Sequence, residues 1–388
     1  MSAQVASSAA RVGYSGVRQI AEIAMQMDGV LKLYFGESSL PTPEYLRRAA
    51  QKAMADGYLY YTENAGLPTL RNALAAYYER LQHVTLDPAS EIVVTNSGVQ
   101  ALNVTIRSVL DPGDEAIILT PAWCNQGRNA ELANGVVREV PLVLCNGRYT
   151  IDFDALEAAV TPRSRLLIYT SPSNPLGWVA TEQDQERLLD FTRRHNLWLL
   201  ADEVYDRLYY GAGLGTPAAS LLRKCTREDA VIIVQSFSKA WCMTGWRVGW
   251  VITRRDLARK VTQLNEFIIS SAPSFCQRAA ETALEWGEIE LKRMLARYKD
   301  NRDVCLAALR KMPRLTVPET DGAFYLFPRV HGVTDSFEFC RVLLEETQVG
   351  LAPGSAFGAG GEACVRICYA ADREILAEAM QRLGDYLA

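Results

Sequence analysis

The sequence lacks several features that would assign it to a specialised class of protein. Every apolar run in its 388 residues is much shorter than the roughly 20 residues that a membrane-spanning helix needs. The formal net charge is −4, so the chain has no basic field for nucleic acid and no polybasic segment for a membrane surface. Repeats, low-complexity linkers and runs of like charge are also missing. These absences argue against nucleic acid and membranes as partners.

The nine cysteines form no CxxC pair and no disulfide framework of the kind found in small secreted proteins. They are typical of reduced, mostly buried thiols, so we expect a cytoplasmic protein and assign no metal site. The N-terminus is rich in Ala, Ser and Arg and has no acidic residue before Glu22, a faint similarity to a transit peptide. Because no cleavage signal follows, we interpret it as an N-terminal arm.

Length and composition predict a globular protein of two domains. Hydrophobic residues make up 49% of the chain and charged residues 22%, which is ordinary for a globular protein. A chain of 388 residues is too long for one simple core. We expect a large domain over residues 46–290 and a small domain over residues 291–388, with residues 1–45 forming the arm and part of the small domain.

Residues 91–252 alternate between short apolar runs and helical segments. The runs are nearly continuous Val, Ile and Leu, as in strands that are covered on both faces. Strands alternating with helices predict an α/β fold with a mostly parallel sheet of about seven strands and helices on both faces. The predicted strands are Ile92–Val94, Ala116–Leu119, Val136–Val140, Leu166–Tyr169, Leu197–Leu200, Val231–Val234 and Val248–Ile252. The predicted helices are Gln100–Leu110, Trp123–Asn134, Thr181–His195 and Ala218–Lys224.

The flanking regions predict a smaller α+β part. A helix is expected over Glu44–Ala55, with Thr42 as its N-cap and Pro43 at its first position. Further helices are expected around Val17–Met27, from Pro68 onward, and over Asp256–Leu264 and Gln277–Leu309. An extended run is expected at Val30–Phe35, and strands at Gly322–Phe327 and Ala363–Tyr369.

Functional side chains follow five of the predicted strands, at the point where each strand ends. In a parallel sheet, ligands bind at the carboxyl ends of the strands. We therefore expect one site that contains Ser97 and Gly98, Trp123, Asn174, Asp202 with Tyr205, and Lys239.

The residues around Lys239 suggest covalent chemistry beside a phosphate. A lysine among Ser, Ala, Trp and Cys is poorly solvated, which favours the neutral, nucleophilic amine that imine formation needs. Ser236, Ser238 and Arg247 are suited to a phosphate. The Ser-Gly turn before helix Gln100–Leu110 adds free N–H groups and the positive end of a helix dipole.

The remaining side chains match a heteroaromatic ring. Asp202 follows a buried strand and needs a cationic partner such as a protonated ring nitrogen. Asn174 and Tyr205 are able to bond a phenolic oxygen, and Trp123 offers a face for stacking. Each of these residues alone also fits a structural role, as a turn, a core residue or a helix cap. Together with Lys239 they indicate pyridoxal 5′-phosphate.

The chain resembles the class I/II aminotransferases, which are fold-type-I pyridoxal-phosphate enzymes similar to aspartate aminotransferase. The resemblance extends from about Leu33 to the C-terminus. It is carried by SFSKAWCMTGWRVGW at 236–250, SPSNPLG at 171–177, ADEVY at 201–205, YTENAGLPTLR at 61–71, DGAFYLF at 321–327, LAPGSAFG from 351 and VRICYA ending at 370.

The resemblance implies a role for each cofactor residue. Lys239 would form the Schiff base and carry the α-proton, and Asp202 would keep the ring nitrogen protonated. Tyr205 and Asn174 would bond the ring oxygen, and Trp123 would stack on the ring. The phosphate would be held by Ser97, the backbone N–H groups of Gly98 and Val99, and the side chains of Ser236, Ser238 and Arg247.

The resemblance also implies substrate and subunit contacts. Arg366 would grip the substrate α-carboxylate with its planar fork, and Gly36 would let the backbone approach the same group. Tyr61 would reach the phosphate of the neighbouring subunit, which implies a homodimer. No second arginine for a distal carboxylate is convincing, because Arg18, Arg128 and Arg254 are better interpreted as surface residues.

The expected activity is the transfer of an amino group between an L-amino acid and a 2-oxo acid, with 2-oxoglutarate as the expected acceptor. The family's reaction runs through Schiff-base and quinonoid intermediates. Two alternatives stay open: a β-lyase or ring-closing enzyme on the same fold, and a non-catalytic regulatory protein that binds the cofactor. Cys124-Asn125-Gln126 departs from the family's common pattern and leaves the substrate side chain undefined.

Overall fold

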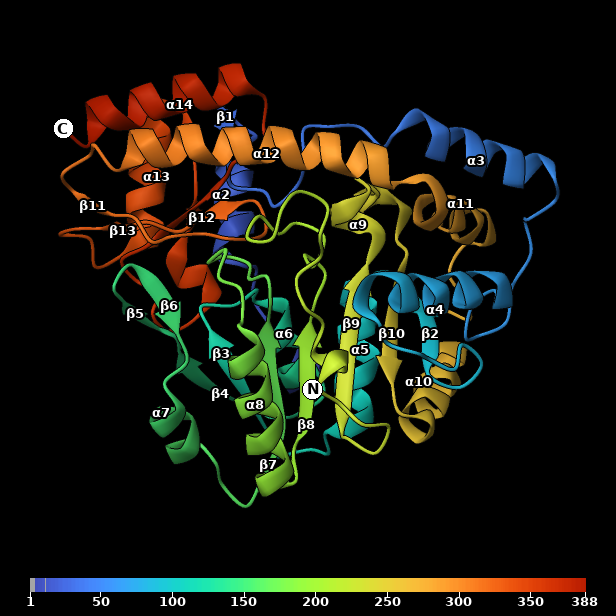
Figure 1. The fold of residues 1–388 in the computed structure, drawn as a ribbon. Coiled ribbons are helices and arrows are strands. Elements are labelled where there is room, and N and C mark those ends of the chain that lie inside the picture. Colours follow the sequence, from blue (N-terminus) through green and yellow to red (C-terminus); the bar gives the residue numbers. More distant parts are fainter. Residues whose placement is uncertain (1–3, 11) are drawn as a thin grey trace.

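A seven-stranded sheet lies at the centre of the computed structural model, which describes residues 4–10 and 12–388 (Figure 1). Residues 1–3 and 11 of the expected arm lie outside the described residues. The strands are β2 (Ile92–Thr95), β3 (Glu115–Thr120), β4 (Val136–Pro141), β7 (Ser164–Thr170), β8 (Trp198–Asp202), β9 (Val231–Ser236) and β10 (Gly249–Thr253). Their order is β2-β10-β9-β8-β7-β3-β4, and β10 runs antiparallel to both of its neighbours. The predicted mostly parallel α/β sheet is confirmed.

Side chains of the sheet alternate between two apolar cores. In β9, Ile232 and Val234 pack under α5 (Gly98–Val109) and α10 (Arg255–Ile268). Ile233 faces the opposite core, which α4 (Pro68–Gln82) and α8 (Glu182–His195) cover on the near side of Figure 1. Each such side chain contributes about 1.5–3 kcal/mol by leaving water. Burial on both faces explains why the inner strands have no polar face, whereas the edge strand β4 is partly exposed and carries Arg138 and Glu139.

Two local predictions are wrong in detail. Thr42 does not cap α3 (Glu44–Ala55), because Pro43 holds the N-cap position and the Thr42 hydroxyl donates to the Cys242 carbonyl instead. Residues 218–224 form only a 3-10 turn, Leu221–Arg223. Its backbone is held from outside, since the Leu221 N–H donates to the buried Glu203 carboxylate at 2.8 Å.

The predicted helical region 277–309 is two helices, α11 (Ser274–Trp286) and α12 (Glu288–Leu309). They separate at Gly287, where a Cβ would lie 2.4 Å from the Ala283 carbonyl oxygen and 2.5 Å from Trp241 Nε1. Figure 1 shows α12 running from α11 toward α14 (Arg373–Tyr386). The domain boundaries predicted at 45/46 and 290/291 fall within α3 and α12, and the division stays a prediction.

The C-terminal segments and the N-terminal helices form a second layer beside the strand ends. Among the helices of the described residues, none has both the length and the apolar character to cross a membrane. The remaining elements are α1 (Ser7–Ala10), α2 (Gly16–Ala24), β1 (Leu31–Lys32), α6 (Asn125–Leu132), β5 (Val143–Cys145), β6 (Arg148–Thr150), α7 (Phe153–Ala158), α9 (Phe237–Ala240), β11 (Leu315–Thr316), β12 (Tyr325–Leu326), β13 (Arg329–Val330), α13 (Ser336–Thr347), β14 (Val349–Gly350), β15 (Ala352–Pro353) and β16 (Val365–Cys368), with 3-10 turns at Thr244–Trp246 and Gly354–Phe357.

Candidate active site

A cavity of about 370 Å³ lies at the carboxyl ends of the parallel strands. It is lined by residues from β-strand ends, from the segment before α3 and from β16. Of the residues predicted for the site, it brings together Gly36, Ser97, Gly98, Val99, Trp123, Asn174, Asp202, Tyr205, Ser236, Ser238, Lys239, Arg247 and Arg366. Tyr61 is not among its lining residues and is 88% exposed.

Lys239 follows β9 on the single-turn helix α9 and points its amine into the cavity. Its Nζ donates to the Gly36 carbonyl oxygen at 2.6 Å. Burial lowers the pKa of Lys239 to about 8, and Arg366 and Arg247 act in the same direction, while Cys368 and Glu37 oppose them. At pH 7 about a tenth of this amine is therefore unprotonated and nucleophilic, far more than for a lysine in water.

Asp202 ends β8 and is 2% exposed. Its Oδ2 accepts from Gln126 Nε2 at 3.2 Å and its Oδ1 from the Val204 N–H at 3.4 Å. Burial raises the pKa of Asp202 to about 6, although both hydrogen bonds and the charge of Lys239 lower it. A carboxylate in this position would be stabilised strongly by a cation placed against it in the cavity.

Gln126 is a site residue that the sequence did not assign. It is fully buried on α6, and its Nε2 also donates to Thr170 Oγ1 at 2.6 Å. One turn of α6 thus reaches the ends of both β7 and β8. The short segment after Trp123, which departs from the common pattern, was the available signal, but nothing in it indicates that Gln126 faces Asp202.

Three buried acids in this region predict an unusual pH dependence of stability. Burial raises the pKa of Glu203 to about 8 and those of Asp202 and Asp206 to about 6, whereas unfolded carboxyls titrate near about 4. Between about pH 4 and these values the folded state binds more protons than the unfolded state, so stability falls as pH rises. The melting temperature of the ligand-free protein should drop by roughly 1–4 °C from about pH 5.5 to about pH 8.5.

The matched variant for this prediction is Glu203→Gln, which removes the group with the highest of the three pKa values. Its melting temperature should depend less on pH over the same window, measured by calorimetry at constant ionic strength. Equal slopes for the two proteins would contradict the assignment of Glu203 as the main titrating group.

An anion cradle lies at the start of α5. Ser97 caps this helix with a φ of 96°, a conformation rare outside glycine that turns the following N–H groups toward the cavity. Ser236 Oγ donates to Ser238 Oγ at 2.9 Å. The Arg247 guanidinium donates to the Thr244 carbonyl at 2.7 Å and forms no ion pair with an acid of the described residues. The chemistry of this donor set suits a phosphate.

Arg366 holds the opposite wall of the cavity. It is 3% exposed, and its NH1 donates to Asn174 Oδ1 at 2.9 Å while its NH2 donates to the Tyr34 carbonyl. Its Nε is buried and has no hydrogen-bond partner among the described residues. The guanidinium forms no ion pair with an acid of the described residues, and a carboxylate in the cavity would supply that partner.

The family model for aminotransferases of class I and II matches residues 28–383. The chain belongs to this aminotransferase family. The predicted family, and with it an enzyme that transfers amino groups, is confirmed.

Individual relatives agree with this assignment. The aminotransferase is 32% identical to an aspartate aminotransferase of Pyrococcus horikoshii, over 95% of this chain and 93% of the relative. It is 33% identical to aromatic-amino-acid aminotransferase 2 of Thermococcus litoralis, over 97% and 96% of the two chains. The solved structure of a single mutant of Thermus thermophilus aspartate aminotransferase superposes with a TM-score of 0.92 at 29% identity, covering all of both chains.

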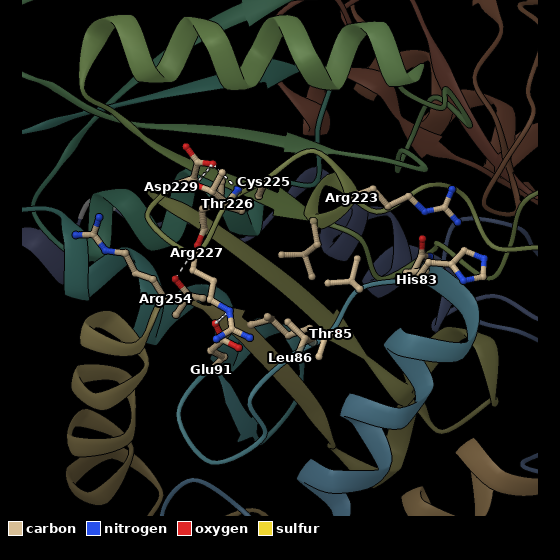
Figure 2. A pocket seen from close by; sticks show the side chains of 16 residues that line it. His83, Thr85, Leu86, Glu91, Arg223, Cys225, Thr226, Arg227, Asp229 and Arg254 are labelled. Carbon is tan, nitrogen blue, oxygen red and sulfur yellow. Dashed lines mark hydrogen bonds and ion pairs between the residues drawn. The ribbon is translucent and has the colours of Figure 1, made fainter.

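A second hollow of the aminotransferase lies at the other end of the sheet (Figure 2). It is larger, about 570 Å³, and is lined by His83 and three arginines. Two of these arginines already face acids: Arg227 lies 3.6 Å from Glu91, and Arg254 lies 2.8 Å from Asp256. We place the chemistry in the smaller cavity, because there, and not in the second hollow, described residues bring together a nucleophilic amine, a buried carboxylate and an anion cradle.

Proposed function

We propose that the protein is a pyridoxal-5′-phosphate-dependent aminotransferase that moves an amino group between an L-amino acid and a 2-oxo acid. The observation that carries the proposal is the cavity in which Lys239, Asp202 and Arg247 converge. Among the described residues, the buried carboxylate has no ion-pair partner and the Arg247 guanidinium has no acid, and the amine has a lowered pKa. A cofactor with a ring nitrogen, a phosphate and an aldehyde satisfies all three.

The residues present fit each part of this cofactor. Asp202 would hold a proton at the ring nitrogen, and Asn174 Nδ2 with the Tyr205 hydroxyl would bond the ring oxygen. Trp123 and Val204, which both line the cavity, would pack against the ring. Ser97, Ser236, Ser238, Arg247 and the N–H groups of Gly98 and Val99 would hold the phosphate. When bound, the cofactor supplies an aldehyde for the amino group and a ring that accepts electrons.

Arg366 would orient the substrate, and Lys239 would move its α-proton. The guanidinium of Arg366, which lines the cavity, would bind the α-carboxylate beside the backbone of Gly36 and so place the α-carbon near the amine. Lys239 Nζ would be the base that takes the proton from the α-carbon and the acid that returns it. Its lowered pKa suits both directions of that transfer near neutral pH.

Substitution of Arg366 should weaken the binding of every substrate to a similar extent. For Arg366→Lys we expect kcat/KM to fall about 100-fold for every amino acid tested, mainly through KM, because each shares the α-carboxylate and a lysine has no planar fork. Steady-state kinetics with several donors checks this, with the exposed Arg341→Lys as the control. A loss restricted to one donor would contradict the role.

The acceptor and the assembly are parts of the same proposal. We propose 2-oxoglutarate as acceptor, supported by Arg18 and Asn125, which line the cavity and carry groups suited to a distal carboxylate. Arg18, interpreted from the sequence as a surface residue, pairs with Glu22 at 3.0 Å and would exchange this partner for the substrate. We propose a homodimer in which Tyr61 reaches the partner's phosphate site, supported by the 83% and 88% exposure of Tyr60 and Tyr61. We keep the predicted domain division and propose a cytoplasmic location, supported by free cysteines throughout the described chain.

A half-reaction tests the proposed function. Adding an L-amino acid to the cofactor-loaded enzyme without acceptor should replace the visible absorption of the lysine-bound cofactor by that of its aminated form, and 2-oxoglutarate should restore it. Release of pyruvate and ammonia instead would favour the β-lyase. Absence of any spectral change with all donors would favour a regulatory protein.

A further inference from the structure

Two tyrosine hydroxyls meet at the wall of the active-site cavity. Tyr205 follows β8 and Tyr325 begins β12, 120 residues later, and their Oη atoms are 2.7 Å apart. Both side chains are buried, with 3% and 0% exposure, and both line the cavity. Tyr205 has a role in the proposed function as a donor to the ring oxygen, whereas Tyr325 has none.

The direction of the hydrogen bond between them depends on what Tyr205 does with its own proton. Each hydroxyl carries one proton, and neither has another hydrogen-bond partner among the described residues, so on these contacts either hydroxyl can be the donor. In the proposed function Tyr205 donates its proton to the ring oxygen. The Tyr205 oxygen then accepts the proton of Tyr325, and Tyr325 is the donor while the cofactor is bound.

The Tyr325 hydroxyl is held in this place by its neighbours. A Cβ on residue 36 would lie 2.2 Å from Tyr325 Oη, so Gly36 leaves the room that the hydroxyl occupies. Tyr325 pairs with Cys368 in the β12–β16 ladder. Its ring lies 4.5 Å from the Arg366 guanidinium carbon and 4.7 Å from the Phe324 ring centroid. Backbone pairing and packing on two sides leave the phenol little freedom.

We propose that Tyr325 is a positioning residue that acts on the cofactor through Tyr205. It points the Tyr205 O–H at the ring oxygen and strengthens its donation, because a hydroxyl that accepts a hydrogen bond is a stronger donor. The inference rests on the proposed pyridoxal-phosphate function. A stronger bond to the ring oxygen stabilises negative charge there and reduces its attraction for the proton on the neighbouring, lysine-derived nitrogen. That proton is then lost at a lower pH.

The test is the pH dependence of the visible absorption of the cofactor-loaded enzyme without substrate. Tyr325→Phe should raise the midpoint of this pH titration by about 0.2 to 0.6 pH unit. This is the part of the Tyr205 effect expected from the cooperative strengthening of one hydrogen bond. Tyr205→Phe should move it upward by about one to two units. The double variant should match Tyr205→Phe alone, since Tyr325 acts only through Tyr205.

Tyr210→Phe is the matched control, because Tyr210 donates to the Ala323 carbonyl at 2.8 Å and does not line the cavity. Its midpoint should equal that of the unchanged protein. Gly36→Ala displaces the Tyr325 hydroxyl and should raise the midpoint as Tyr325→Phe does. It replaces Tyr325→Phe in the test if Tyr325→Phe does not fold.

Three results have separate meanings. A shift in Tyr205→Phe with none in Tyr325→Phe or Gly36→Ala overturns the relay and leaves the proposed function intact. Additive shifts in the double variant also overturn it, because Tyr325 would then act on the cofactor directly. Absence of a Lys239-dependent visible band in the unchanged protein would overturn the proposed function itself.

Discussion

Lys239→Ala is expected to lower turnover by more than about 1,000-fold and to remove the visible absorption of the lysine-bound cofactor. The substitution removes the nucleophile that links to the cofactor and the base that moves the α-proton, and general acid–base catalysis alone contributes about 10²–10⁴-fold. Phosphate contacts from Arg247 and the start of α5 remain, so the cofactor should still bind, more weakly. Spectra and single-turnover kinetics of the purified variant measure both effects.

Lys239→Arg distinguishes the loss of the positive charge from the loss of the nucleophilic amine. A guanidinium keeps the positive charge and most of the volume, but it stays protonated near neutral pH and cannot form the covalent link. Its activity should be as low as that of Lys239→Ala. Lys299 on α12 is half-buried, pairs with Asp303 and does not line the cavity, so Lys299→Ala should be as active as the unchanged enzyme. Turnover and a visible band retained in Lys239→Ala would refute the site assignment.

Much of the fold was predictable because the signal is local. Each central strand is an uninterrupted run of apolar side chains, as Val231–Val234 shows, since both faces of the sheet are covered. Polar residues that follow such runs at the carboxyl ends must meet at one edge. Ser97, Trp123 and Lys239 follow three such runs, and all three line the same cavity.

The remainder depends on contacts between distant segments. Tyr325 reaches Tyr205 only because β12 pairs with β16 beside the strand ends. Gln126 reaches Asp202 only because α6 begins against β7 and β8, and its sequence neighbours indicate neither contact. Thr42 has the composition of a helix cap, but its hydroxyl donates to Cys242, 200 residues away. Local propensity gives way wherever a buried tertiary hydrogen bond competes with it.

Asp202→Ala should reduce turnover by about 100- to 1,000-fold, the size expected for losing one preorganised electrostatic partner of the reacting charge. The carboxylate is buried, so its attraction for the protonated ring nitrogen of the proposed cofactor would be weakly screened. Without the carboxylate, that nitrogen would lose its proton near neutral pH and the ring would accept electrons poorly when the α-proton leaves. Substrate binding through Arg366 is unaffected, so kcat should fall more than KM rises.

A methyl group on the ring nitrogen turns this prediction into a test of mechanism. A cofactor analogue methylated there carries a fixed positive charge and needs no carboxylate to keep it, so it should restore part of the activity of Asp202→Ala. Asp206 is a buried acid outside the cavity. The turnover of Asp206→Asn should therefore stay within a few-fold of that of the unchanged enzyme with the ordinary cofactor. Equal activity of Asp202→Ala with the methylated and the ordinary cofactor would refute the electronic role. Asp202 would then be a structural acid held by Gln126, and the electron-accepting ring would need another source of positive charge.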